Sequence, residues 1–114
     1  MSNENAQQAT EEKKVVTRDD VIAVLKMIFD PEIPVDIYNL GLVYDIQIDD
    51  ENNVKIRMTL TAPSCPAAQS LPMQVDWQVR GIPGVKDVDV EIVWDPPWSM
   101  DMMSEEAKLT LGYL

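Results

Sequence analysis

Two neighbouring segments alternate apolar and polar side chains on either side of a short polar turn. In residues 42–49 and in residues 54–61 every even-numbered residue is apolar, and DENN separates the segments. A period of two with such a break predicts two antiparallel strands joined as a hairpin. The apolar faces coincide only where paired residue numbers sum to an even value, for example Ile46 with Ile56. The register of the hairpin is therefore strongly restricted. The expected apolar face holds Leu42, Tyr44, Ile46, Ile48, Val54, Ile56, Met58 and Leu60.

The other face of this hairpin is polar. Lys55 and Arg57 are expected there, together with Thr59 and Thr61. In the allowed registers the two basic residues face acids of the first strand, so we interpret them as cross-strand partners and not as a ligand patch. The residues of the first strand on this face are the acids Asp45 and Asp49 and the amide Gln47.

A helix is expected before the hairpin. Thr17 is a suitable N-cap, and two aspartates follow in the first turn, where the helix dipole favours acids. Apolar residues then recur at helical spacing as far as Ile28 and Phe29, and Asp30-Pro31 is expected to end the helix after about three turns. From Asp30 to Gly41 the chain is rich in proline but still apolar, which predicts an ordered loop packed on the domain.

A second helix is expected after the hairpin, where Leu71, Val75 and Val79 recur at helical spacing before Gly81. Pro72 does not suit a helix interior, because it removes one hydrogen bond and clashes with the preceding turn. The sequence leaves two alternatives: a helix kinked near Ala68, or a regular helix beginning at about Ser70.

A third strand is expected over Val85–Trp94, followed by a tail in which Ser104 starts a short helix. Each strand has one polar face, which predicts an α+β fold in two layers: a three-stranded sheet covered by two helices on one side. Residues 1–16 are polar and repetitive and are expected to be a disordered lead. The expected domain then spans residues 17–98, and the tail spans residues 99–114.

Charge and residue usage exclude several classes of function. The net charge of −11 argues against nucleic acid and anionic membranes as partners, whereas a basic partner protein is compatible with it. The chain has no histidine, which excludes Ser-His-Asp and Cys-His catalysis and every zinc site containing histidine. A single cysteine permits no internal disulfide, so a reducing, cytoplasmic setting is expected.

That cysteine, Cys65, is expected at a helix N-terminus, between Ser64 and Pro66. The helix dipole there lowers a thiol pKa and favours a thiolate that can bind metal or attack an electrophile. The alternative is an inert, packed thiol, and its position alone does not decide between the two. One thiolate cannot fill a four-thiolate cluster site, so a cluster would need further ligands from a second subunit, a partner protein, a small thiol or carboxylates.

Other groups have ordinary structural interpretations. The acids Asp30, Glu32 and Asp36 could hold a cation or position a partner, but such clusters more often form turns. The tryptophans and the methionines of the tail are interpreted as packing. They are Trp77, Trp94, Trp98, Met100, Met102 and Met103.

Four segments resemble the SufT/PaaD-like family of iron–sulfur cluster assembly factors, to which the eukaryotic cytosolic iron–sulfur assembly targeting factor is also similar. They are DPEIPVDIYNLGLVYDI (30–46), MTLTAPSCP (58–66), GIPGVKDVDVEIVWDPPW (81–98) and MSEEAKLTLG (103–112). The resemblance implies an α-β-β-α-β domain with a three-stranded mixed sheet, similar to the NifU C-terminal domain. The chain lacks the C-x-x-C pair of NifU-type scaffolds.

The resemblance also implies a role. The chain would be a non-enzymatic maturation factor that delivers iron–sulfur clusters to client proteins, with a transient or shared cluster and a homodimer as one way of sharing it. The family's cysteine corresponds to Cys65, its acidic loop to Asp30-Pro31-Glu32, and its threonine before the cysteine turn to Thr61. Ser64, Pro66 and Asp36 would shape the site. Two other hypotheses stay open: a metal-free adaptor that makes its contacts through the acidic surface and the Trp98 tail, and an accessory factor of one oxygenase complex, as in PaaD-like members.

Overall fold

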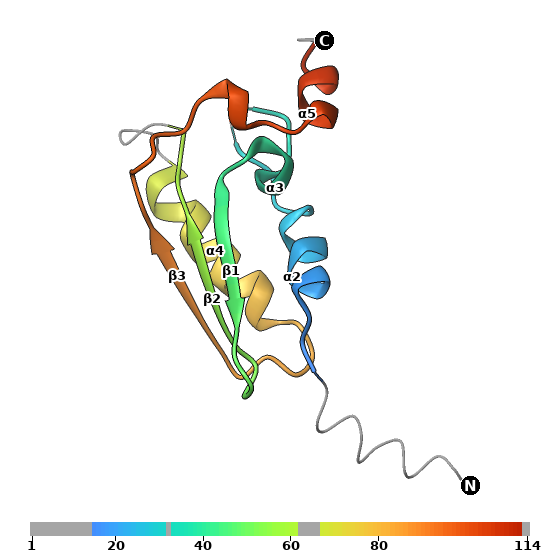
Figure 1. The fold of residues 1–114 in the computed structure, drawn as a ribbon, viewed down its shortest axis with the longest axis vertical. Helices are drawn as coiled ribbons and strands as arrows, with labels where there is room; N and C mark the ends of the chain where they lie inside the picture. The colour runs from blue at the N-terminus through green and yellow to red at the C-terminus, as the bar shows by residue number, and fades with distance from the viewer. Residues whose placement is uncertain (1–14, 32, 62–66, 113–114) are drawn as a thin grey trace, which may run out of the picture.

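A computed structural model describes residues 15–31, 33–61 and 67–112, with the backbone alone at 67–69. Its elements form one three-stranded sheet with helices around it (Figure 1). The sheet has the order β1-β2-β3, in which β1 pairs antiparallel and β3 parallel with β2. The expected mixed α+β fold is confirmed. The elements are α2 (Arg18–Leu25), α3 (Ile37–Leu40), β1 (Val43–Ile48), β2 (Asn53–Met58), α4 (Ala67–Arg80), β3 (Asp87–Ile92), a 3₁₀ turn η1 (Met100–Met102) and α5 (Glu105–Thr110).

The hairpin of β1 and β2 has the register that the alternation predicts. Ile46 lies opposite Ile56, and both are buried. The register shifts between Val43 and Asp45, where Tyr44 is the extra residue of a bulge. The expected place of Tyr44 on the apolar face is therefore wrong. Its hydroxyl instead donates to the carbonyl oxygen of Pro96 in the C-terminal tail, at 2.7 Å.

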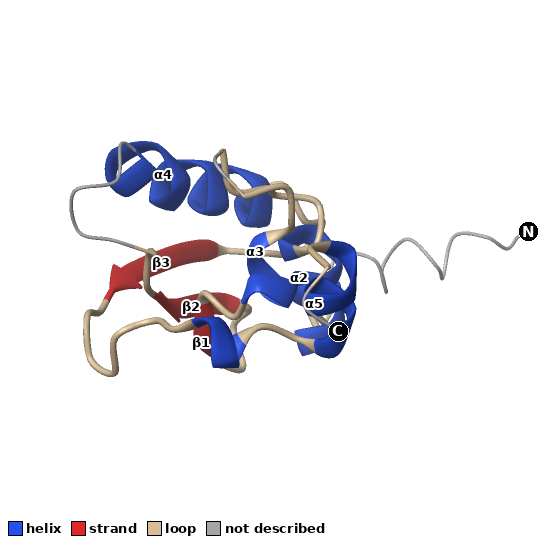
Figure 2. Cartoon of the chain, turned by 90° about the horizontal axis from the view of Figure 1, so that it is seen from above, coloured by secondary structure: helices blue, strands red, loops and turns tan. Residues whose placement is uncertain are grey.

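The core lies between the sheet and α4, which covers one face of the sheet (Figure 2). Leu71, Val75 and Val79 of α4 are at most 1% exposed, as their helical spacing predicts. Helix α2 packs beside α4 and β1. The buried apolar set from the other elements includes Val21, Leu25, Ile28, Val54, Met58, Leu60 and Val88.

Helix α2 begins where the sequence predicts but ends earlier. Thr17 accepts from the backbone N–H of Asp20, and the Asp20 carboxylate accepts from that of Thr17, which is a complete capping box. The helix ends at Leu25, so the expected three turns are wrong. Ile28 still reaches the core, because the chain turns back there and the N–H of Ile37 donates to its carbonyl.

Helix α4 begins at Ala67 and runs continuously to Arg80 with Pro72 inside it. The observed start at Ala67 differs from one of the two alternatives, a regular helix that begins at about Ser70. Pro72 lies near the beginning of the helix, where its missing N–H leaves one carbonyl without an intrahelical donor. Burial of the face formed by Leu71, Val75 and Val79 compensates for that loss.

Both edges of the sheet are partly occupied by arginines from helices. Arg18 of α2 donates to the carbonyl of Ile46 in β1, and Arg80 of α4 donates to the carbonyl of Val88 in β3. On the outer face Oε1 of Glu91 in β3 lies 3.8 Å from Nζ of Lys55 and 3.6 Å from Nε of Arg57. Their ion-pair partner thus comes from β3, whereas we expected acids of the first strand. Strand β3 is shorter than the expected 85–94.

The segments at the two ends of the described chain pack on the domain. Val16 is 3% exposed and its N–H donates to Asn52, so the folded part includes the last residue of the expected lead. Residues 1–14 lie outside the described chain. In the tail Ser104 caps α5 as predicted, and both Met103 and Ala107 are buried.

Candidate functional site

The expected site residues come from two loops near the end of the sheet where β2 finishes. The structure describes Asp30, Asp36 and Thr61, whereas Glu32 and the segment with Ser64, Cys65 and Pro66 lie outside the described residues. Thr61 is half-buried just before that segment, and α4 begins just after it. Residues 59–66 connect β2 to α4 in the sequence, and Cys65 is one of them.

Asp30 is buried and holds its own loop in shape. Its side chain is 5% exposed and accepts from the backbone N–H of Ile33 at 3.0 Å. Its own N–H donates to the carbonyl of Val35. A carboxylate that accepts the N–H three residues later stabilises a turn. The structural role that we considered for this acid is therefore present in the structure.

Asp36 caps the short helix α3. One carboxylate oxygen accepts from the Asn39 N–H at 2.9 Å, and the other accepts from the Asn39 amide at 2.8 Å. We expected an irregular loop from Asp30 to Gly41, so this helix was missed. Its signal is Asp36 followed by Gly41, which adopts the left-handed conformation that ends a helix, with φ +88°.

The C-terminal tail is bound to this same helix. Ser104 donates to the side chain of Asn39 at 2.9 Å, and the Trp98 indole donates to the carbonyl of Leu40 at 2.8 Å. Gly41 packs so closely on Met102 that a β-carbon would lie 2.4 Å from the Met102 carbonyl oxygen. Trp98 is thus partly buried against its own domain, with its indole N–H engaged by the carbonyl of Leu40.

The burial of Thr59, a polar residue, was not predicted from the sequence. The alternation placed it on the polar face of the hairpin, but it is fully buried, and its hydroxyl has no hydrogen-bond partner among the described residues. Strand β2 ends at Met58, but the N–H of Thr59 still donates to the carbonyl of Leu42, at 2.8 Å. Burial raises the pKa of Tyr44, so its hydroxyl stays protonated at neutral pH and donates to the carbonyl of Pro96.

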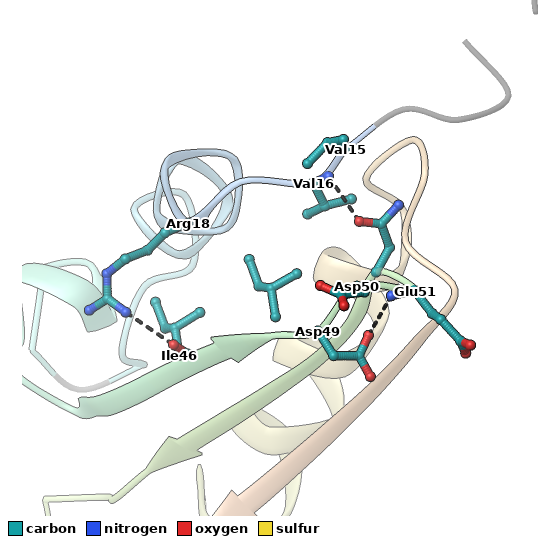
Figure 3. Close-up of a pocket in the computed structure, with 9 residues that line it drawn as sticks. Val15, Val16, Arg18, Ile46, Asp49, Asp50 and Glu51 are labelled. Carbon is teal, nitrogen blue, oxygen red and sulfur yellow. Dashed lines mark hydrogen bonds between the residues drawn. The ribbon is translucent and has the colours of Figure 1, made fainter. Parts of the chain in front are cut away.

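A hollow at the other end of the sheet is not part of this site. Val15, Val16, Arg18 and the hairpin turn line it, and Figure 3 shows that Asp49 points into its own turn. Asp49 accepts from the N–H groups of Glu51 and Asn53, and the hydrogen bonds from Asn53 are the main cause that lowers its pKa. The Asp49 carboxylate is therefore occupied in forming the turn.

Two further features of the described residues concern metal ions and membranes. Within residues 15–31, 33–61 and 67–112, no three His, Cys, Asp or Glu side chains gather closely enough to hold a metal ion. None of the helices in that part of the chain is long and apolar enough to cross a membrane.

Comparison with known proteins decides the family. Residues 18–92 match the family model described as iron–sulfur cluster assembly protein. The chain belongs to this iron–sulfur cluster assembly family. An Fe–S protein maturation auxiliary factor from Porphyromonas gingivalis is 45% identical over 86% of this chain and 93% of its own length. One from Staphylococcus aureus, named SufT, is 48% identical over 75% of this chain and 98% of its own.

A solved structure of the family has the same fold. The domain of unknown function DUF59 from Bacillus anthracis superposes with a TM-score of 0.79 and 39% identity, over 96% of this chain and 100% of that one. The expected SufT-like family and the expected fold class are therefore confirmed.

Proposed function

We propose that this chain is a non-enzymatic, cytoplasmic maturation factor that helps to deliver iron–sulfur clusters to client proteins. The observation that supports this most directly is the relationship to maturation auxiliary factors over most of both chains. The cluster is cargo: it is held with an assembly protein or client, or between two copies of this chain, and then passed on.

Cys65 is the proposed ligand on this chain. It is the single thiol, and the chain has no imidazole. The described residues hold no group of three ligands, so a shared site fits this donor set, and a complete site within one chain does not. Transfer is a ligand exchange without oxidation or reduction. A client cysteine thiol loses its proton to solvent and its sulfur binds iron, while the Cys65 Sγ–Fe bond breaks and Cys65 leaves as a thiolate.

The other residues shape the site in this proposal. Asp30 and Asp36 use carboxylate oxygens to accept N–H groups of their own loop, so they order the segment beside the end of β2. Thr61, Ser64 and Pro66 are close to Cys65 in the sequence and are proposed to shape its surroundings. Glu32 lies in the same acidic loop as Asp30 and is proposed as part of it.

Anaerobic reconstitution with iron and sulfide tests the ligand role. Cluster absorbance and iron per chain are measured for wild type, Cys65→Ser and Asp30→Asn. We expect Cys65→Ser to lose the cluster and Asp30→Asn to keep it, because an amide oxygen still accepts the Ile33 N–H. If Cys65→Ser binds as much cluster as wild type, the ligand role is wrong. Loss of the cluster in folded Asp30→Asn would show that this carboxylate binds iron.

A further inference from the structure

Two large apolar side chains stand exposed on the outer side of α4. Met73 is 71% exposed and Trp77 is 80% exposed, and they lie one helical turn apart on the same face. The opposite face carries the buried residues Leu71, Val75 and Val79. Packing of Trp77 within the domain, as expected from the sequence, is therefore wrong.

The surface around this pair is a shallow groove, and we call it the α4 surface. In the described part of the chain no other helix or strand lies over the outer side of α4 (Figure 2). Exposed tryptophan next to methionine is the composition of interface hot spots, where burial of the aromatic ring supplies much of the binding energy. The α4 surface is lined by Ser70, Met73, Gln74, Asp76, Trp77 and Arg80.

We propose that the α4 surface docks a basic partner protein, which places an apolar side chain against Met73 and Trp77. This rests on the proposed maturation function, because the partner that shares the cluster is the protein that would dock here. Helix α4 begins two residues after Cys65, and Met73 lies about 9 Å along the helix axis from Ala67. A partner of ordinary size on the α4 surface therefore reaches the end of the helix where the cluster ligand is attached.

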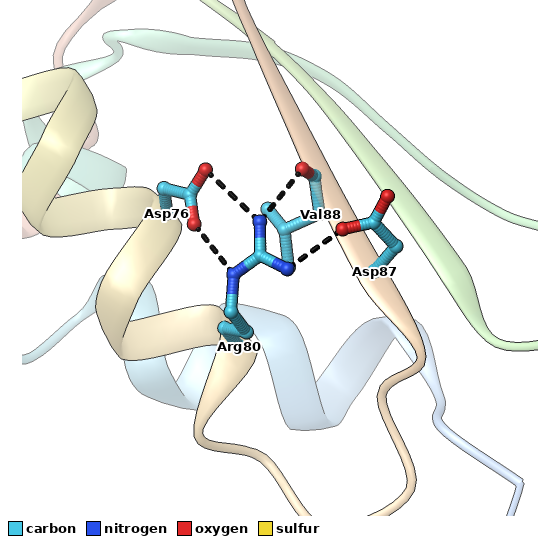
Figure 4. A network of polar contacts seen from close by, with 4 residues as sticks. All are labelled: Asp76, Arg80, Asp87 and Val88. Carbon is cyan, nitrogen blue, oxygen red and sulfur yellow. Dashed lines mark hydrogen bonds and ion pairs between the residues drawn. The ribbon is translucent and has the colours of Figure 1, made fainter.

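The charge of the partner follows from the network around Arg80. Its guanidinium donates to Asp76 at 2.9 and 3.3 Å, to Asp87 at 2.7 Å and to the Val88 carbonyl (Figure 4). These contacts turn Arg80 towards β3 and neutralise it, so the three side chains together carry one negative charge. The whole chain carries −11. A basic surface is attracted to this field, and an acidic surface is repelled.

A second copy of the chain fits the α4 surface less well. The two exposed side chains offer on the order of 300 Å² of apolar area, so a symmetric contact would bury about 600 Å² where a stable interface needs about 1,200 Å² or more. Extending that contact would bring together two chains whose net charge is −11 each. A basic partner can extend the contact by pairing with Asp76 and Asp87, whose side chains are 37% and 66% exposed. The flexible Met73 side chain also suits a surface that meets several clients.

A synthetic amphipathic helix tests the proposal directly. The probe is a labelled 18-residue peptide of Leu and Lys, measured by fluorescence anisotropy at physiological salt. Two comparison peptides replace Leu with Ser or Lys with Glu. The test variant is Met73→Ala/Trp77→Ala. The matched control is Met27→Ala/Leu109→Ala, because those side chains are 76% and 65% exposed elsewhere.

We expect the Leu/Lys peptide to bind wild type and the control equally and the Met73→Ala/Trp77→Ala variant at least about 30-fold more weakly. Equal binding to that variant would overturn the proposal, as would equal binding of either comparison peptide. Sedimentation that shows a wild-type dimer lost in this variant would assign the α4 surface to a second copy. Circular dichroism checks that both variants fold.

The two proposals fail separately. Cys65→Ser is expected to keep peptide binding, whereas Met73→Ala/Trp77→Ala is expected to keep the cluster on reconstitution. A Cys65→Ser variant that retains its cluster would refute the ligand role without affecting the docking result.

Discussion

Replacement of Gly41 by alanine is expected to weaken the attachment of the C-terminal tail. Gly41 has φ +88°, and an added β-carbon would lie 2.4 Å from the carbonyl oxygen and 2.8 Å from the carbonyl carbon of Met102. The left-handed backbone costs an L-residue about 1–2 kcal/mol. Overpacking against backbone adds about 1–3 kcal/mol. Gly41→Ala should therefore lower the free energy of unfolding by roughly 2–5 kcal/mol, which in a domain of this size lowers Tm by at least about 8 °C.

Urea unfolding followed by circular dichroism measures this loss. Gly112→Ala is the control, because Gly112 has a similar φ of +85° but nothing within 4 Å of an added β-carbon. The difference between the two variants isolates the collision with Met102. Adding Met102→Ala should not rescue Gly41→Ala, because the nearest atoms belong to the backbone. Equal effects at the two glycines, or rescue by Met102→Ala, would refute the reasoning.

Two further predictions concern the caps and the charge network. Asp36→Ala should lower the free energy of unfolding by about 1 kcal/mol in urea titrations, because the Asn39 N–H loses its acceptor, while Asp36→Asn should cost much less. Arg80 holds the pKa of Asp87 below its ordinary value of 3.8, so the stability from this pair is present above that value and is lost as the pH falls through the lowered pKa. The Tm of wild type should therefore fall more steeply below about pH 4 than that of Asp87→Asn, and parallel Tm curves would contradict this.

The sequence predicts those features of the fold that depend on local pattern. The alternation in the hairpin gave the pairing of Ile46 with Ile56, and Thr17 and Ser104 marked helix starts that the structure contains. Helical spacing identified the buried face of α4. Each of these follows from neighbours within a turn of helix or a hairpin, so the residues themselves carry the information.

The candidate site was predictable only in part. Asp30, Asp36 and Thr61 remain candidates named from the sequence, and the pattern did not show that both aspartates accept N–H groups of their own loop. Asn39, which joins that loop to the tail, was missed because its partner Ser104 lies 65 residues away in the chain. A hydrogen bond over that separation leaves no periodic signal.

The sequence by itself determined the chemistry that this chain can offer: one thiol, no imidazole and a strongly negative charge. The tertiary structure decided which side chains face water. Thr59 is fully buried although the alternation places it on the polar face of the hairpin. Trp77 is exposed although tryptophan usually packs, because no described element lies beyond α4. Periodicity defines the two faces of an element, but burial depends on whether another layer reaches each face.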